Sequence, residues 1–254
     1  MRSRDKSGVE ARPGSRSGES TRSVIYDPTR ADAWVRLGDV YCKLRRFRPA
    51  AECYRHALAI RSDRRGKYRL WFGLAHADAA CGRLESAADS YRRAVALRPG
   101  SHEAWYNLGS VCAELGRLRL AVRAYRAALD RAPDDQEIWN NLGNVLVELG
   151  RTHEGIRCYE KALDLVPHFD IAWNNLGVAL EEIGDVVGAS AAIGRALDAN
   201  PDRTTYLVNR ASALAKSGRR EKAVEHLAHA MELEPDLRVL LSSLPELGGL
   251  LREP

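Results

Sequence analysis

The stretch WNNLGNVLVELGR occupies residues 139–151, and a closely similar stretch, WNNLGVALEEIGD, occupies residues 173–185. The two copies begin 34 residues apart. The chain has five tryptophans, separated by 37, 34, 34 and 34 residues: Trp34, Trp71, Trp105, Trp139 and Trp173. A fixed period of this length indicates stacked structural repeats rather than one globular domain.

Other columns align when each tryptophan is taken as position 4 of a repeating unit. Leucine occupies position 7 in five units, and glycine or alanine occupies positions 8 and 20 in six. Tyrosine occupies position 24 in four units, and alanine occupies position 27 in all six. Glycine occupies position 15 in five units, and proline occupies position 32 in five, with Ser62 as the exception. The sixth unit keeps this frame without a tryptophan.

Each unit predicts two helices. Positions 4, 7, 8 and 11 have helical spacing, as do positions 20, 24, 27 and 28. Glycine at position 15 can adopt the left-handed conformation that ends the first helix, and proline at position 32 ends the second. Small residues at positions 8, 20 and 27 allow the two helices to approach closely. Because one such pair cannot bury its apolar face alone, the units are expected to stack.

This pattern resembles the tetratricopeptide repeat, with its W-x2-L-G-x2-Y signature followed by A, Y, A and P. The resemblance covers Ala31 to about Pro235. It implies an all-α fold, a right-handed α-solenoid of six helix-turn-helix repeats. The predicted repeats are residues 31–67, 68–101, 102–135, 136–169, 170–203 and 204–235. Asp78 departs from the pattern at position 11, where a large apolar residue is expected. Three residues inserted within 61–69 are expected to lengthen the loop between repeats 1 and 2.

The ends of the chain fall outside the repeats. Residues 1–22, rich in Ser, Gly and Arg, are expected to form a disordered basic tail. Residues 23–30 are either a lead-in or the remnant of another repeat. Residues 236–254 are expected to form a C-terminal capping helix that covers the last apolar face.

Asparagine occupies position 6 in repeats 3–6, as Asn107, Asn141, Asn175 and Asn209. Position 6 lies nearly opposite the stripe formed by positions 4, 7, 8 and 11, so these side chains point away from the core of their own repeat. Asparagine is a mediocre helix former, and four in register call for a reason. The column resembles the asparagine ladder in the repeat region of O-linked N-acetylglucosamine transferases. That resemblance implies that the carboxamides line a concave groove and hold the backbone of an extended peptide. Alternatively, asparagine at this position only helps to build the wall of the groove.

Further polar residues are expected on the same surface. Asn140 and Asn174 occupy position 5, Asn144 occupies position 9, and Glu114, Glu148 and Glu182 occupy position 13. Such a polar and acidic surface favours a basic or neutral extended peptide as the partner. Alternatively, the glutamates only solvate a helix face. The expected groove lacks the Lys and Arg set with which chaperone-binding family members hold a terminal carboxylate.

The sequence also raises other functions. The chain carries a formal charge of +5, but residues 1–101 hold 22 basic and 11 acidic side chains, whereas residues 102–201 hold 9 and 15. The basic clusters at 43–48 and 61–69 could bind acidic protein or nucleic acid. Because no aromatic platform or nucleic-acid module accompanies them, solvated faces are the favoured interpretation, and nucleic acid is not an expected partner. Two alternatives stay open: a recruitment module for a separately encoded enzyme such as a glycosyltransferase, and self-association through a repeat end.

Little in the sequence indicates catalysis. There is no nucleophile elbow, phosphate loop or glycosyltransferase domain, so we expect a non-catalytic scaffold without a cofactor. His226 and His229 share a helix face but have no evident third metal ligand. Five cysteines without regular spacing are interpreted as reduced core thiols. No signal peptide or membrane-spanning stretch is found, so a cytoplasmic protein is expected.

Overall fold

The computed structural model describes residues 30–61 and 63–242, and these residues form helices and turns without a strand. The chain divides into two units, one ending at Leu115 and the other beginning at Gly116. The first unit contains α2 (Ala31–Lys43), α3 (Phe47–Ile60), α4 (Arg64–Ala80), α5 (Leu84–Leu97) and α6 (His102–Glu114). The second contains α7 (Leu118–Leu129), α8 (Gln136–Glu148), α9 (Thr152–Leu165), α10 (Asp170–Glu182), α11 (Val186–Ala199), α12 (Thr204–Lys216), α13 (Arg220–Leu233) and α14 (Leu237–Ser242).

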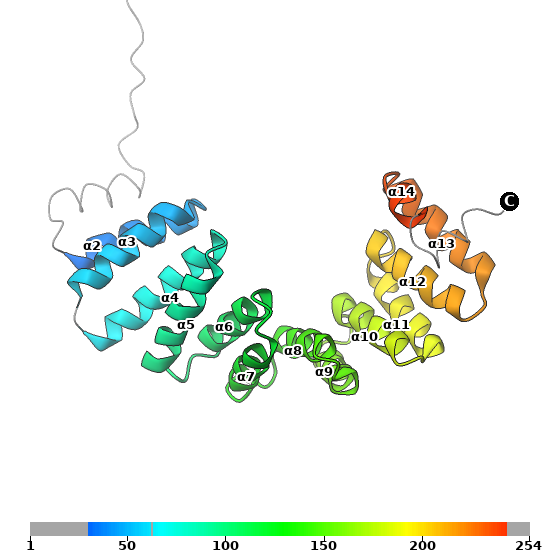
Figure 1. Ribbon diagram of the computed structural model, residues 1–254, viewed down its shortest axis with the longest axis horizontal. Helices are drawn as coiled ribbons and strands as arrows, with labels where there is room; N and C mark the ends of the chain where they lie inside the picture. The colour runs from blue at the N-terminus through cyan, green and yellow to red at the C-terminus, as the bar shows by residue number, and fades with distance from the viewer. Residues whose placement is uncertain (1–29, 62, 243–254) are drawn as a thin grey trace, which may run out of the picture. The chain divides into compact units, whose positions relative to one another are not determined.

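Within each unit, consecutive helices pair through short turns and pack against the next pair (Figure 1). The predicted all-helical fold of helix-turn-helix repeats is therefore confirmed. The predictions for residues 1–22, for 23–29 and for 243–254 lie outside the described residues.

Glycine forms the turn inside five of the repeats. Gly82, Gly116, Gly150, Gly184 and Gly218 all have positive φ, between 67° and 88°. The equivalent residue of the first repeat is Arg45, which adopts φ 56° although it has a side chain. The left-handed conformation expected at position 15 is thus present in every repeat, with a strained residue in the first.

The small residues allow the close packing predicted for them. Ala50, Ala57, Ala121 and Ala128 are fully buried. A methyl group added at Gly143 would lie 2.5 Å from Cε1 of Tyr159, so glycine at position 8 makes room for the ring at position 24. The tyrosine rings and the residues that face them therefore fix the distance between the paired helices.

The spacing of tryptophan and proline that recurs from repeat to repeat also has a structural basis. Nε1 of Trp105, Trp139 and Trp173 donates to the carbonyl oxygen of the proline six residues earlier, at 2.8–2.9 Å. Each bond ties a first helix to the turn that precedes it. Tryptophan at position 4 therefore fastens one repeat to the end of the repeat before it.

The insertion between repeats 1 and 2 lengthens a helix and not the loop, so the loop prediction is wrong. Only residues 61–63 separate α3 from α4, compared with residues 98–101 between α5 and α6. Instead α4 has 17 residues, whereas α2 and α6 have 13. The side chain of Asp63 accepts a hydrogen bond from the backbone N–H of Gly66 at 2.6 Å and so starts α4 about one turn early.

The short helix α14 lies against the last repeat. Leu241 of α14 is 1% exposed and packs in one cluster with Leu214 and Leu227. The described part of the predicted capping segment therefore covers apolar side chains of repeat 6.

Candidate functional site

The asparagines of α8, α10 and α12 come together in the second unit. Asn140 and Asn174, at position 5, are buried, with 5% and 7% exposure. Asn141, Asn175 and Asn209, at position 6, are half-buried, and Asn144, at position 9, is exposed. Asn107 and Glu114, which were also predicted as site residues, lie on α6 in the first unit.

Hydrogen bonds between asparagines cross from one repeat to the next. Nδ2 of Asn175 donates to Oδ1 of Asn140 at 3.0 Å and to Oδ1 of Asn144 at 3.1 Å. Nδ2 of Asn209 donates to Oδ1 of Asn174 at 2.9 Å. The residue at position 6 of one repeat thus bonds to position 5 of the repeat before it. These bonds also show that the faces of α8, α10 and α12 that carry asparagine are continuous.

A tyrosine from the second helix holds the exposed member of this network. The hydroxyl of Tyr159, on α9, donates to Oδ1 of Asn144 at 2.8 Å. Burial raises the pKa of Tyr159, so the hydroxyl stays protonated and remains a donor. Repeat 1 uses the same geometry, because Tyr54 donates to Oδ1 of Asp39, also at position 9, at 2.9 Å.

Helical spacing predicted that position 6 points away from the core of its own repeat, but it did not predict the bonds between asparagines. A signal was present, since positions 5 and 6 of neighbouring repeats are 35 residues apart and both hold asparagine in repeats 4 and 5. In repeat 2, position 6 is Gly73, where an added methyl group would meet the ring of Tyr54 at 2.8 Å. An asparagine at this position would therefore require the Tyr54 ring to shift.

Comparisons with known proteins agree with this architecture. Models described as tetratricopeptide repeat match residues 31–64, 72–136, 114–152 and 204–237, and one described as TPR repeat matches residues 143–184. Together they span most of the region that holds the helix pairs. The chain is a tetratricopeptide repeat protein. No curated protein matches its sequence.

Several solved structures share this fold. PilF from Pseudomonas aeruginosa is 18% identical, with a TM-score of 0.69 over 94% of this chain and 100% of PilF. MamA from Desulfovibrio magneticus is 21% identical, with a TM-score of 0.63 over 67% and 96% of the two chains. YrrB, described as a TPR protein with an unusual peptide-binding site, is 18% identical, with a TM-score of 0.55 over 87% and 94%. At these identities the likeness concerns the fold alone. The resemblance to the repeat region of O-linked N-acetylglucosamine transferases rests on the asparagines at position 6 and not on these comparisons.

Two of the predicted acidic residues lie at the ends of α8 and α10. Glu148 and Glu182 are both exposed, and Glu182 accepts a hydrogen bond from the Thr152 hydroxyl at 3.3 Å. The neighbouring Glu181 points differently, because it accepts from the Ser212 hydroxyl and pairs with Nζ of Lys216, both at 2.8 Å. The lysine at position 13 of α12 is therefore neutralised within the tetratricopeptide unit itself.

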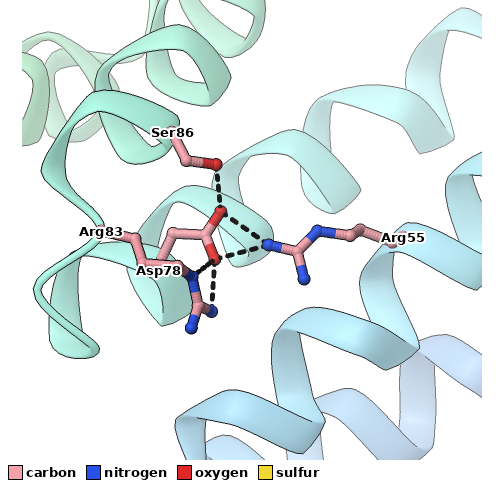
Figure 2. Close-up of polar contacts among 4 residues, drawn as sticks. All are labelled: Arg55, Asp78, Arg83 and Ser86. Atoms are coloured by element: carbon pink, nitrogen blue, oxygen red, sulfur yellow. Dashed lines mark hydrogen bonds and ion pairs between the residues drawn. The ribbon is translucent and has the colours of Figure 1, made fainter.

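Asp78, the departure noted in repeat 2, forms a buried polar cluster that the sequence did not predict (Figure 2). Its carboxylate is fully buried on α4. Arg83 donates to Oδ1 through Nε and a terminal nitrogen at 2.9 and 2.6 Å, and Ser86 donates to Oδ2 at 2.6 Å. Arg55 of α3 donates to both oxygens. The hydrogen bond to Asp78 raises the pKa of Arg83, so the Arg83 guanidinium stays charged.

The remaining candidate groups are dispersed. Among residues 30–61 and 63–242, no three His, Cys, Asp or Glu side chains gather as metal ligands would. His229 lies 3.4 Å from a carboxylate oxygen of Asp202, and burial lowers the pKa of His226. Cys53 and Cys158 are buried, and burial raises the pKa of each thiol to about 11. No helix in the described part of the chain has the length and apolar character needed to cross a membrane.

Proposed function

We propose that this tetratricopeptide protein is a non-catalytic scaffold that holds an extended segment of a partner protein against α8, α10 and α12. The observation that carries the proposal is the hydrogen bond from Asn175 to Asn144 across the repeat boundary. This bond joins the half-buried carboxamide of Asn175 to the exposed carboxamide of Asn144, and each retains a polar group that can bind a ligand. Asn141 and Asn209, at the same position of the neighbouring repeats, extend the surface on either side.

Asn175 and Asn144 together match one peptide unit. Asn175 uses both N–H groups on Asn140 and Asn144, so its carbonyl oxygen, which otherwise has only a 3.5 Å contact with Asn174, can accept from a peptide N–H. Oδ1 of Asn144 accepts from Asn175 and Tyr159, and no described residue accepts from its amino group, which can donate to a peptide carbonyl. One acceptor and one donor thus lie side by side on the surface.

The inter-repeat bonds lower the cost of binding. Carboxamides that are already fixed by their neighbours lose less side-chain entropy when a ligand arrives. Asn140 and Asn174 are buried, so their role in this proposal is to orient Asn175 and Asn209, while the more exposed asparagines contact the peptide. Because a carboxamide pair binds the backbone, this grip tolerates different side chains.

The charge of the surface supports a basic or neutral segment as ligand. Glu148 and Glu182 are exposed beside the asparagines, whereas Lys216 is neutralised by Glu181. The fold that the chain shares with YrrB is compatible with peptide binding. The chemistry of the surface and not that likeness is the basis of the proposal.

A peptide selection tests the proposal. Nine-residue peptides selected from a random phage library on the full chain would be labelled, and their Kd values measured by fluorescence anisotropy. We expect Asn141→Ala with Asn175→Ala to weaken binding about tenfold or more, as the loss of two hydrogen bonds implies. Glu160→Ala is the control, since Glu160 is an exposed side chain on α9. Unchanged binding by the double variant would refute the asparagine grip.

A further inference from the structure

The three helix faces that carry the asparagines differ in the residues around them. On one face of a helix, positions 2, 6, 9 and 13 follow one another at spacings of four, three and four. On α8 these positions hold Glu137 and Glu148 around Asn141 and Asn144. On α12 they hold Thr205, Asn209, Ser212 and Lys216. Polar or charged side chains therefore surround the asparagines of both helices.

On α10 positions 2 and 9 are apolar, whereas position 13 is the exposed Glu182. Ile171, at position 2, is 38% exposed, and Val178, at position 9, is 43% exposed. They lie four residues before and three residues after Asn175, so the three side chains share one face of the helix. Two exposed aliphatic side chains thus flank Asn175, which makes two of the three cross-repeat asparagine bonds.

The neighbouring face of α8 is acidic. Glu137 and Glu148 are exposed, and among the described residues neither carboxylate has a basic partner. The bond from Asn175 to Asn144 shows that this face adjoins the apolar face of α10. On the other side, Lys216 of α12 is paired with Glu181, so that face adds no free positive charge.

We propose that this surface selects a segment in which a basic residue and an aliphatic residue lie about three residues apart. The inference rests on the proposed function and adds side-chain specificity to it. Packed helices lie about 8–10 Å apart and an extended chain advances about 3.3 Å per residue, so the step from α8 to α10 corresponds to about three residues. Glu137 and Glu148 lie 11 residues apart on α8, about 16 Å along the helix axis, so the basic residue pairs with one of the two. The aliphatic residue packs between Ile171 and Val178 beside Asn175.

The test uses designed peptides on the full chain. Labelled nine-residue peptides of serine and glycine would carry lysine and leucine three residues apart, in both orders. Matched peptides would have leucine replaced by alanine, or lysine by glutamine. We expect the peptide with both residues, in one of the two orders, to bind about tenfold more tightly than the alanine peptide, as transfer of a leucine side chain from water implies. Equal affinity for the leucine and alanine peptides would overturn the inference.

Substitutions taken from the next repeat then locate the effect. Ile171→Thr with Val178→Ser gives α10 the residues that α12 has at the same positions, Thr205 and Ser212. This variant should bind the leucine and alanine peptides alike, while Val187→Ser, at an exposed site on α11, should keep the difference. Glu137→Gln with Glu148→Gln should remove the preference for lysine and retain that for leucine. Persistent leucine selectivity in the α10 variant would place the apolar contact elsewhere and refute the inference.

The two proposals fail in different ways. Loss of the asparagines should weaken the leucine and alanine peptides by the same factor, because the backbone contact is common to both. If the asparagine variant weakens binding but the α10 variant does not alter selectivity, the specificity proposal alone is wrong. If the designed peptides do not bind while library peptides depend on the asparagines, the same conclusion holds. If selectivity depends on α10 but the asparagine variant binds normally, the backbone grip is wrong.

Discussion

Arg55 donates from one nitrogen to both carboxylate oxygens of Asp78, at 2.9 and 3.2 Å, and this contact joins α3 of repeat 1 to α4 of repeat 2 (Figure 2). Asp78 is fully buried, whereas the Arg55 side chain is 46% exposed. Loss of a partner leaves the buried carboxylate with fewer hydrogen-bond donors, whereas loss of the carboxylate allows each partly exposed arginine to be solvated by water. Two opposite predictions follow for the two sides of this cluster.

Removing a partner of Asp78 should cost more than replacing the buried carboxylate itself. Arg83→Ala leaves Asp78 buried with fewer donors and should lower the free energy of unfolding by about 2 kcal/mol. Asp78→Leu introduces the residue that repeats 4–6 have at the same position, and buried charges replaced by apolar residues are often neutral or stabilising. Urea unfolding would measure both. A larger loss for Asp78→Leu than for Arg83→Ala would contradict this account.

The first repeat should gain stability when its turn is given the residue found in the others. Arg45 adopts φ 56°, a conformation that costs a residue with a side chain about 1–2 kcal/mol relative to glycine. Arg45→Gly should therefore raise the urea midpoint. Arg46→Gly, at the next position, is a control that should not, because Arg46 has φ −92°. A midpoint lowered by Arg45→Gly would show that the arginine side chain contributes more than its backbone strain costs.

The direction of the cross-repeat hydrogen bonds can be tested by charge. Asn175→Asp replaces the donor with a carboxylate that faces the carbonyl oxygens of Asn140 and Asn144, so Asn140 loses this donor and Asn144 keeps only Tyr159. We expect a loss of about 2 kcal/mol or more in the free energy of unfolding. Thr205→Asp adds the same charge to the exposed first turn of α12, where a negative charge is favourable, and should change stability little. Equal stability of the two variants would indicate that the asparagine bonds contribute nothing.

The tryptophan bond to the preceding turn should have a measurable value. Trp139→Phe keeps an aromatic ring but removes the hydrogen bond to the carbonyl of Pro133, and should cost about 1 kcal/mol. Trp71→Phe is a useful comparison, because Trp71 lies 4.5 Å from the Arg93 guanidinium, a contact that a phenylalanine ring can retain. Thermal unfolding of both variants would separate the lost hydrogen bond from the general effect of a smaller ring.

Stability should fall in alkali partly because of buried thiols. The pKa values of Cys53 and Cys158 are raised from 9.0 to about 11, chiefly by burial. The unfolded chain therefore loses these protons at lower pH than the folded chain, and its population gains as the pH rises. The contribution is complete below about pH 9 and is lost as the pH rises to 11. Cys158→Ala should make the pH dependence of the urea midpoint shallower in this window, with Cys81→Ala as the control. An unchanged slope would contradict the burial argument.

The sequence predicted the helix pairs because the glycine and proline positions are local features that recur with the repeat period. Helical geometry alone also predicted that position 6 points away from the core of its own repeat, whereas the role of the asparagines in holding a peptide stays a prediction. It could not show that Asn175 meets Asn140, because that contact depends on how neighbouring repeats stack. The partners of Asp78 were hidden in the same way: Arg55 lies 23 residues away and its approach is fixed only by packing. The insertion was misinterpreted because Asp63 can start a helix earlier, and the repeat frame does not show where an added residue will go.

The bond between Asn175 and Asn140 forms only when the two asparagines occupy matching places in neighbouring repeats. A single residue added within α10 ahead of Asn175 would rotate Asn175 by about 100° around the helix axis and carry it away from its partner. Repeats could therefore be gained or lost as whole units without disturbing the carboxamide array, whereas one residue added near the start of a first helix would interrupt it. Selection for ligand binding would then act on the position of each asparagine within its helix as well as on the residues that touch the ligand.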